Sequence, residues 1–103
     1  MKHAWFAVTP AAANRPALVV ASGDIDLANV EEFRTAMTKA CNGSDTLTID
    51  LTDVSYCDST AVGALFSVAA TTALTLLIRP SGNIKTLLRI SGLDRVATVV
   101  TKE

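Results

Sequence analysis

The 103-residue chain is poor in the residues that metal sites and nucleic-acid surfaces usually need. Its only histidine is His3, and its only cysteines are Cys41 and Cys57, too few for a tetrahedral zinc site without carboxylates. Lysine and arginine form no cluster, and the net charge is −1, which argues against nucleic-acid binding. We therefore expect no metal, no cofactor and no nucleic-acid partner.

Long apolar runs are also missing. The longest candidate, residues 61–78, is interrupted by Gly63, Ser67 and several threonines, so it is unsuited to span a bilayer. The first residues lack the apolar core of a secretory signal. These absences predict a cytoplasmic protein without direct membrane insertion. Because 50% of the residues are hydrophobic, the chain can build one core, and we expect a single domain over residues 1–103.

Apolar spacing predicts strands that alternate with helices. Strands are expected at residues 4–8, 17–22, 46–51, 73–78 and 96–100, with a short turn at 52–54. Helices are expected at residues 27–41, 59–70 and 81–91. Asp26 and Ser81 are suitable caps for the first and third of these helices. The alternation from residue 17 onward predicts an α/β fold with mainly parallel strands.

The segment Asp58-Ser59-Thr60 places a carboxylate and two hydroxyls where the helix at 59–70 begins. Backbone N–H groups and the positive end of the helix dipole converge there. Since Asp, Ser and Thr are common helix caps, a purely structural role is the simplest interpretation. The alternative is a site where a phosphate is added to a hydroxyl and removed again. The residues alone leave both open.

Catalysis finds little support in the sequence. A Ser-His-Asp site would need the fold to bring His3 to Ser59, and no nucleophile elbow, P-loop or dinucleotide fingerprint is present. Cysteines of an intracellular protein are usually reduced and buried. A helix N-terminus can lower the pKa of a thiol, however, so a redox role for Cys57, together with Cys41, stays a hypothesis.

The whole chain resembles the STAS domain family, typified by bacterial anti-sigma factor antagonists. The resemblance depends on four segments that occur in the family's order and spacing: Gly23-Asp24-Ile25-Asp26, the strand at 47–53, Asp58-Ser59-Thr60-Ala61-Val62-Gly63, and Ile90-Ser91-Gly92-Leu93. It implies an α/β STAS fold, with a mixed, mostly parallel sheet of four to five strands packed with about four helices.

The resemblance also implies a function. In that family the unphosphorylated antagonist binds an anti-sigma factor, which is also its serine kinase, and so releases a sigma factor; a serine phosphatase reverses the phosphorylation. The matching phosphoacceptor is Ser59, with Thr60 as the alternative. The protein itself would not be an enzyme. Partner contacts are expected from Asp24, Asp26, Asp58, Ser59, Thr60, Ala61 and Val62.

Two departures from the family pattern bear on this function. Ala61 stands where the family usually has glycine, and its methyl group is expected to alter how closely a kinase approaches Ser59. The stretch between the helix at 59–70 and the next strand is shorter than usual. STAS domains also occur as non-catalytic subunits of lipid-transport ABC complexes, where they contact the ATPase. This is the alternative function.

Overall fold

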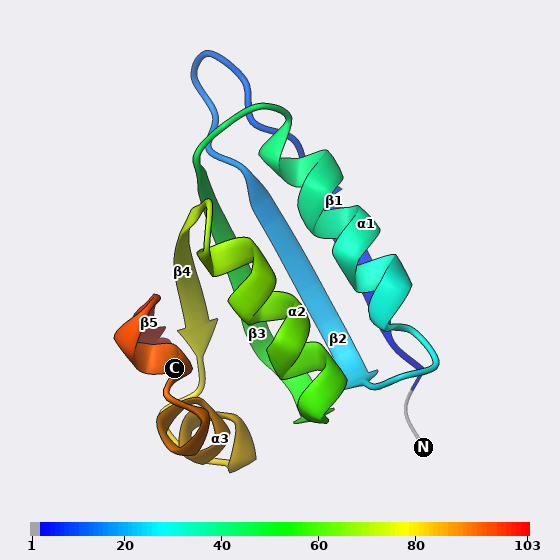
Figure 1. Cartoon of the computed structure of the whole chain (residues 1–103), viewed down its shortest axis with the longest axis vertical. Helices are drawn as coiled ribbons and strands as arrows, with labels where there is room; N and C mark the ends of the chain where they lie inside the picture. The colour runs from blue at the N-terminus through cyan, green and yellow to red at the C-terminus, as the bar shows by residue number, and fades with distance from the viewer. Residues whose placement is uncertain (1–2) are drawn as a thin grey trace.

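Five strands form one mixed sheet in the computed structural model of the protein, which describes residues 3–103 (Figure 1). The strands lie in chain order across the sheet; β1 is antiparallel to β2, and β2 to β5 are parallel. The elements are β1 (Trp5–Thr9), β2 (Leu18–Ile25), α1 (Val30–Cys41), β3 (Thr46–Cys57), α2 (Ser59–Ala69), β4 (Ala73–Ile78), α3 (Asn83–Ser91), a 3₁₀ helix (Leu93–Arg95) and β5 (Thr98–Thr101).

This arrangement confirms the predicted α/β class and the mixed, mostly parallel sheet. Across residues 3–103 there are three α-helices, and the expected number of about four is reached only by including the 3₁₀ helix. Helices α1 and α2 lie beside each other against one face of the sheet, while α3 lies near the end of β3 (Figure 1). The start of α2 is therefore positioned by packing of this helix against the sheet and against α1.

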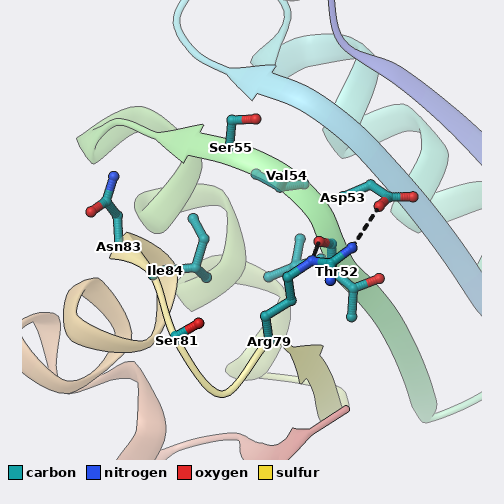
Figure 2. A pocket seen from close by; sticks show the side chains of 10 residues that line it. Thr52, Asp53, Val54, Ser55, Arg79, Ser81, Asn83 and Ile84 are labelled. Atoms are coloured by element: carbon teal, nitrogen blue, oxygen red, sulfur yellow. Dashed lines mark hydrogen bonds and ion pairs between the residues drawn. The ribbon is translucent and has the colours of Figure 1, made fainter. Parts of the chain in front are cut away.

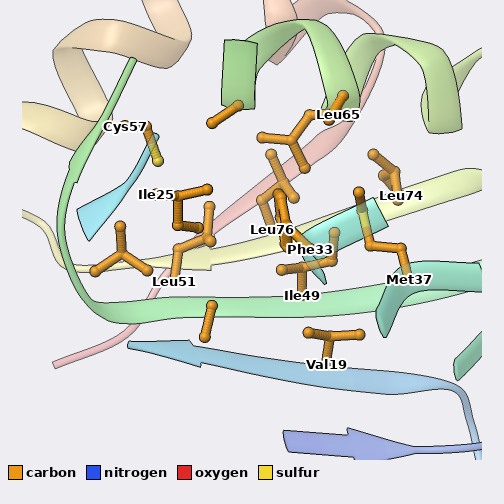
Figure 3. Close-up of a cluster of buried hydrophobic side chains, with 14 of the residues drawn as sticks. Val19, Ile25, Phe33, Met37, Ile49, Leu51, Cys57, Leu65, Leu74 and Leu76 are labelled. Atoms are coloured by element: carbon orange, nitrogen blue, oxygen red, sulfur yellow. The ribbon is translucent and has the colours of Figure 1, made fainter. Parts of the chain in front are cut away.

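The core lies between the sheet and these helices (Figure 3). Burial alternates along β2 and β4, as expected for strands with one face against helices. From α1, Phe33 and Met37 are fully buried, and the Phe33 ring stacks on Phe6 of β1 with centroids 5.3 Å apart. The central strands contribute Val19, Ala21, Ile25, Leu47, Ile49, Leu51, Leu74, Leu76 and Ile78. These contacts fix α1 over β1 and β2.

Strand β3 is twice as long as predicted, because it continues through the segment expected to turn at 52–54. Pairing with β2 shifts register between Val20 and Ser22 and again between Gly23 and Asp24, so β3 carries an extra residue at each step. The turn signal in the sequence has a local counterpart, since the Asp50 carboxylate accepts hydrogen bonds from Thr52. The bulges absorb this local bend, and the strand runs on to Cys57.

Two predicted caps are wrong. Helix α1 begins at Val30, not at residue 27, and the residue before it is Asn29; Asp26 lies in the preceding turn. Helix α3 begins at Asn83 after Gly82, which takes a φ of 116° that disfavours other residues, so Ser81 does not cap it. In both cases the turn before the helix is longer than expected, so the helix begins later than the predicted cap residue indicated.

Gly23 and Gly63 provide a matched test of the fold. Gly23 has a φ of 88°, and a Cβ there would collide with the backbone of His3. Gly63 lies within α2, where a Cβ would meet nothing within 4 Å. We predict that Gly23→Ala lowers the free energy of unfolding by about 1–2 kcal/mol or more, while Gly63→Ala raises it by about 1 kcal/mol through helix propensity. Urea denaturation followed by circular dichroism measures both. Equal stability of Gly23→Ala and the unchanged protein would contradict the close approach of the His3 backbone to Gly23.

Candidate functional site

The carboxylate of Asp58 caps α2 and joins it to the loop between β2 and α1. Its Oδ1 accepts hydrogen bonds from the backbone N–H of Thr60 at 3.0 Å and of Ala61 at 3.2 Å, and from the Thr60 hydroxyl. Its Oδ2 accepts the N–H of Leu27 at 3.2 Å. The backbone N–H of Asp58 also donates to the carbonyl of Ile25 at 3.2 Å. One residue therefore holds together two segments separated by about thirty positions in sequence.

These donors determine the charge of the cap. The hydrogen bond from the Thr60 hydroxyl is the main cause of a lowered pKa of Asp58. The backbone N–H groups of Ala61, Thr60 and Leu27 lower that pKa further and outweigh partial desolvation, which raises it. Asp58 is consequently a carboxylate at neutral pH. It lies at the N-terminal end of α2, where the helix dipole favours negative charge.

The two hydroxyls at this helix start lie in different surroundings. Ser59 is the first residue of α2 and is exposed, and the capping hydrogen bonds come to Asp58 rather than to its side chain. Thr60 is half-buried and its hydroxyl donates to Asp58. Of the two predicted phosphoacceptors, Ser59 is therefore the accessible one.

Asp24 and Asp26 lie in and beside the loop that Asp58 holds. The carboxylate of Asp26 accepts the N–H of Ala28 at 3.0 Å, while its own N–H donates to the Asn29 side chain at 3.0 Å. The amide of Asn29 donates in turn to the carbonyl of Asp24 at 2.9 Å. Both aspartates are half-buried. The loop is thus ordered by short-range side-chain hydrogen bonds, and Asp26 is brought to the same end of the sheet as Asp58.

Ala61 and Val62, also expected to contact a partner, lie beneath the surface. Ala61 is fully buried in the core, and Val62 is 9% exposed. They were expected at the partner surface because the family resemblance covers the whole segment from Asp58 to Gly63, whereas the helical turn directs both side chains toward the sheet. Neither residue therefore belongs to the exposed part of this site, which includes Ser59.

Two exposed apolar residues beside the site were not predicted. Leu27, which was assigned to a helix, lies in the turn bound by Asp58 and is 74% exposed. Tyr56, two residues before Asp58, is 51% exposed. The only available signal for the exposure of Leu27 was its apolar side chain, at a position that the structure shows to be an ordered loop. We call Asp26, Leu27, Asp58 and Ser59 the Ser59 surface.

The cysteines do not form a redox pair. Both are free, and they lie at opposite ends of β3: Cys41 precedes its start and Cys57 is its last residue. Burial, together with the nearby charges of Asp58 and Asp24, raises the pKa of the Cys57 thiol to about 12. The expectation of a lowered pKa at the helix N-terminus is therefore wrong, because desolvation and two carboxylates act against the thiolate. Desolvation also raises the pKa of Cys41.

A pocket of about 350 Å³ lies between the bulged part of β3 and the loop from β4 to α3 (Figure 2). Its arginine, Arg79, donates from Nε to the carbonyl of Thr52 at 2.7 Å and pairs with Asp53 at 3.4 Å. The guanidinium is thus already engaged by β3. It links the β4–α3 loop to the strand segment that leads to Asp58.

Residues 3–103 hold neither a metal cluster nor a membrane-spanning helix. No group of three or more His, Cys, Asp or Glu side chains in this range could hold a metal ion. No helix of the same range is long and apolar enough to cross a membrane.

Comparison with known proteins places this fold among described families. Residues 8–101 match the family model described as "Mlab, STAS domain". No curated protein sequence gives a significant match.

Similar solved structures include an anti-sigma factor antagonist from Mycobacterium paratuberculosis, with 20% identity, a TM-score of 0.80, and 94% of this chain and 85% of that chain covered. The anti-sigma factor antagonist SpoIIAA in its unphosphorylated form gives 21% identity and a TM-score of 0.71, covering 95% and 90%. Bacillus SpoIIAA in the phosphorylated form gives 23% identity and a TM-score of 0.61, covering 95% and 93%. At these identities the likeness establishes the fold.

The capping role of Asp58 leads to a prediction about stability. Asp58→Ala should lower the free energy of unfolding at pH 7 by about 1–2 kcal/mol, as loss of a helix cap does. Asp58→Asn keeps a neutral acceptor and should cost less. Because the pKa of Asp58 is lowered in the folded state, its ionic contribution is present above its ordinary pKa and disappears as the pH falls through the folded-state value.

Urea titrations at pH 7 and pH 3 check this. The gap in stability between the unchanged protein and Asp58→Asn should narrow at the lower pH. A gap that is constant or widens would show that Asp58 does not act as a charged cap.

The raised pKa of Cys57 predicts an inert thiol. In a Cys41→Ser protein, Cys57 should react with Ellman's reagent at pH 8 far more slowly in the folded state than in urea, because only the thiolate attacks. A Cys57→Ser protein serves as the control that reports Cys41 alone. Fast labelling of Cys57 in the folded protein would restore the redox hypothesis.

Proposed function

The chain belongs to the STAS domain family, and we propose that it acts as an anti-sigma factor antagonist whose partner binding is switched by phosphorylation of Ser59. The unphosphorylated protein binds an anti-sigma factor with serine kinase activity, in the cytoplasm, and thereby releases a sigma factor. The kinase transfers the γ-phosphoryl group of ATP to the Ser59 hydroxyl, and a serine phosphatase removes it. In this role the protein is a binding module and not an enzyme.

The division of tasks at the start of α2 is the observation that carries the proposal. Asp58 satisfies the helix N-terminus, and the Thr60 hydroxyl is committed to Asp58. Ser59 is exposed and is not needed as a cap. A hydroxyl without a capping role can be modified without removing any interaction that holds the helix start in place.

The substitution of glycine by Ala61 is compatible with this function. The methyl group of Ala61 is fully buried and points into the core, and the residue's N–H donates to Asp58. The expectation that this methyl group alters the approach of a kinase to Ser59 is therefore not supported.

The switch follows from charge at the Ser59 surface. Phosphoserine carries about −1.5 to −2 charges near neutral pH. It would join the ionised Asp58 and lie at the same end of the sheet as Asp26. A partner that accepts a neutral hydroxyl between acidic and apolar groups would then face a dense negative charge with strongly bound water. Couplings of about 1–3 kcal/mol, or 5- to 150-fold in affinity, are typical of such switches.

The fold itself should tolerate the phosphate. The N-terminus of α2 presents backbone N–H groups and a dipole that favour negative charge. The core residues that α2 contributes, Ala61, Ala64 and Leu65, are apolar and buried. The modification is therefore expected to act on the partner rather than on the folding of the protein.

The alternative function, a non-catalytic subunit that contacts a transporter ATPase, has support of its own. The matching family description names Mlab. Helix α2 carries no charged residue, and Phe66, on its outer side, is 36% exposed. A partner could pack against such a helix without reference to phosphate. In that case modification of Ser59 would have no regulatory role.

A comparison of Ser59 variants tests the proposal. With a purified anti-sigma factor kinase, Ser59→Ala should bind constitutively, and Ser59→Asp should bind at least about tenfold more weakly, which is about 1.4 kcal/mol. Ser67→Asp places the same charge on an exposed serine further along α2 and should bind like the unchanged protein. Isothermal titration calorimetry gives the affinities, and circular dichroism verifies folding.

The same variants separate the two functions. Equal affinity of Ser59→Ala and Ser59→Asp for the kinase would contradict the phosphorylation switch. Binding to a transporter ATPase that is unaffected by Ser59→Asp, with no binding to the kinase, would establish the alternative. Mass spectrometry after incubation with kinase and ATP should find phosphate on Ser59. In the Thr60→Ala protein, phosphate should be found on Ser59 and on no other residue.

A further inference from the structure

Strand β1 forms an open edge of the sheet. In the part of the chain that the structure describes, it pairs with β2 on one side and with no strand on the other. Its sequence, Trp-Phe-Ala-Val-Thr, contains no charge and no proline, the features that commonly block edge pairing. Trp5, the only tryptophan of the chain, is 53% exposed there. This edge is therefore suited to accept another strand.

Beside the edge lies a groove of about 590 Å³ between β1 and α1. Its floor is apolar and includes Phe6 and Val8. Its α1 side carries Glu32 near the start of the helix and Lys39 near its end. Neither charge has an ion-pair partner within residues 3–103, whereas Glu31 pairs with Arg34 at 3.4 Å. The groove thus has an acidic end and a basic end that are free to pair with another molecule.

These charges are placed symmetrically about the middle of β1. Helix α1 runs in the same direction as β1, since their C-terminal ends meet: the N–H of Ala11, just after β1, donates to the carbonyl of Ala40 in the last turn of α1. Phe6 stacks on Phe33, which puts the two at one level. One strand residue, about 3.3 Å, corresponds to about two helix residues at 1.5 Å each. Ala7, the centre of β1, therefore lies level with Thr35.

Thr35 is next to the midpoint between Glu32 and Lys39. A two-fold axis through Ala7, perpendicular to the sheet, would consequently exchange the acidic end of one groove with the basic end of the other. This self-complementarity is what a symmetric dimer interface requires.

We propose that two copies of this chain associate through their β1 strands, antiparallel and centred on Ala7, to form one continuous sheet. Phe6 of one copy lies opposite Val8 of the other, and Trp5 opposite Thr9. Glu32 of each α1 pairs with Lys39 of the second α1. The occupant of the groove is therefore a second copy of the chain.

The spacing of the layers fits this arrangement. Neighbouring strands lie about 4.8 Å apart, and α1 packs on both β1 and β2. A helix lying over the middle of that strand pair is displaced by about half a strand spacing from β1, so the two α1 helices would be about 10 Å apart. Helices pack at about 8–10 Å, and the facing residues Thr35 and Ala36 are small enough for this distance.

The proposed dimer leaves the function of the Ser59 surface untouched. Because β1 strands are antiparallel across the axis, the two Ser59 surfaces would lie toward opposite ends of the assembly. Dimerisation can be measured without a partner protein and with Ser59 intact, so absence of the dimer is distinguishable from failure of the proposed switch.

Charge reversal provides the test. Sedimentation velocity between about 10 μM and 1 mM should show a monomer–dimer equilibrium, with a blue shift of Trp5 fluorescence as the dimer forms. Glu32→Lys and Lys39→Glu should each raise the dimer dissociation constant by about tenfold or more, because like charges then face each other at both ends. Lys85→Glu, an exposed reversal on α3, serves as the control and should have no effect.

An equimolar mixture of Glu32→Lys and Lys39→Glu should restore association as a heterodimer, and the double variant should restore the homodimer. Such rescue arises only if Glu32 meets Lys39 of another copy. A protein that stays monomeric at 1 mM, a dimer insensitive to either reversal, or a mixture without rescue would each overturn the proposal. Circular dichroism of every variant confirms that the comparison is made between folded proteins.

Discussion

The hydrogen bonds to the Asp58 carboxylate are the interaction on which the candidate site depends. This single group satisfies the start of α2 and binds the N–H of Leu27 in the β2–α1 loop. It therefore sets both the position of Ser59 and the shape of the surface next to it. Because a carboxylate performs the capping, the neighbouring serine is left on the surface without a structural task. The chemistry proposed for Ser59 is a consequence of this division.

The sequence alone predicted those parts of the molecule that local signals define. Helix α2 begins at Ser59 as expected, since Asp, Ser and Thr before an apolar periodic segment are a strong start signal. The length of β3 was not predictable, because its continuation through residues 52–57 depends on two bulges that form only against β2. The pKa of Cys57 was misjudged for a similar reason: burial and the carboxylate of Asp24 come from the tertiary fold.

The sheet gives the protein two distinct surfaces. At the ends of β2 and β3, the Ser59 surface combines ionised and apolar groups on an ordered loop. At the outer edge of β1, where no further strand pairs within residues 3–103, a groove with one acidic and one basic end lies alongside. The first surface suits a partner that is sensitive to added charge. The second suits an identical chain, so dimerisation and the switch can operate independently.

The most direct test of the switch compares the unmodified protein with protein phosphorylated at Ser59. Calorimetric titration with the same anti-sigma factor kinase gives the two affinities, and ¹⁵N–¹H spectra of both forms report on the fold. The account predicts at least about tenfold weaker binding by the phosphorylated form, with amide shifts confined to the β2–α1 loop and the first turns of α2. Equal affinities, or shifts that spread through the core strands, would contradict it.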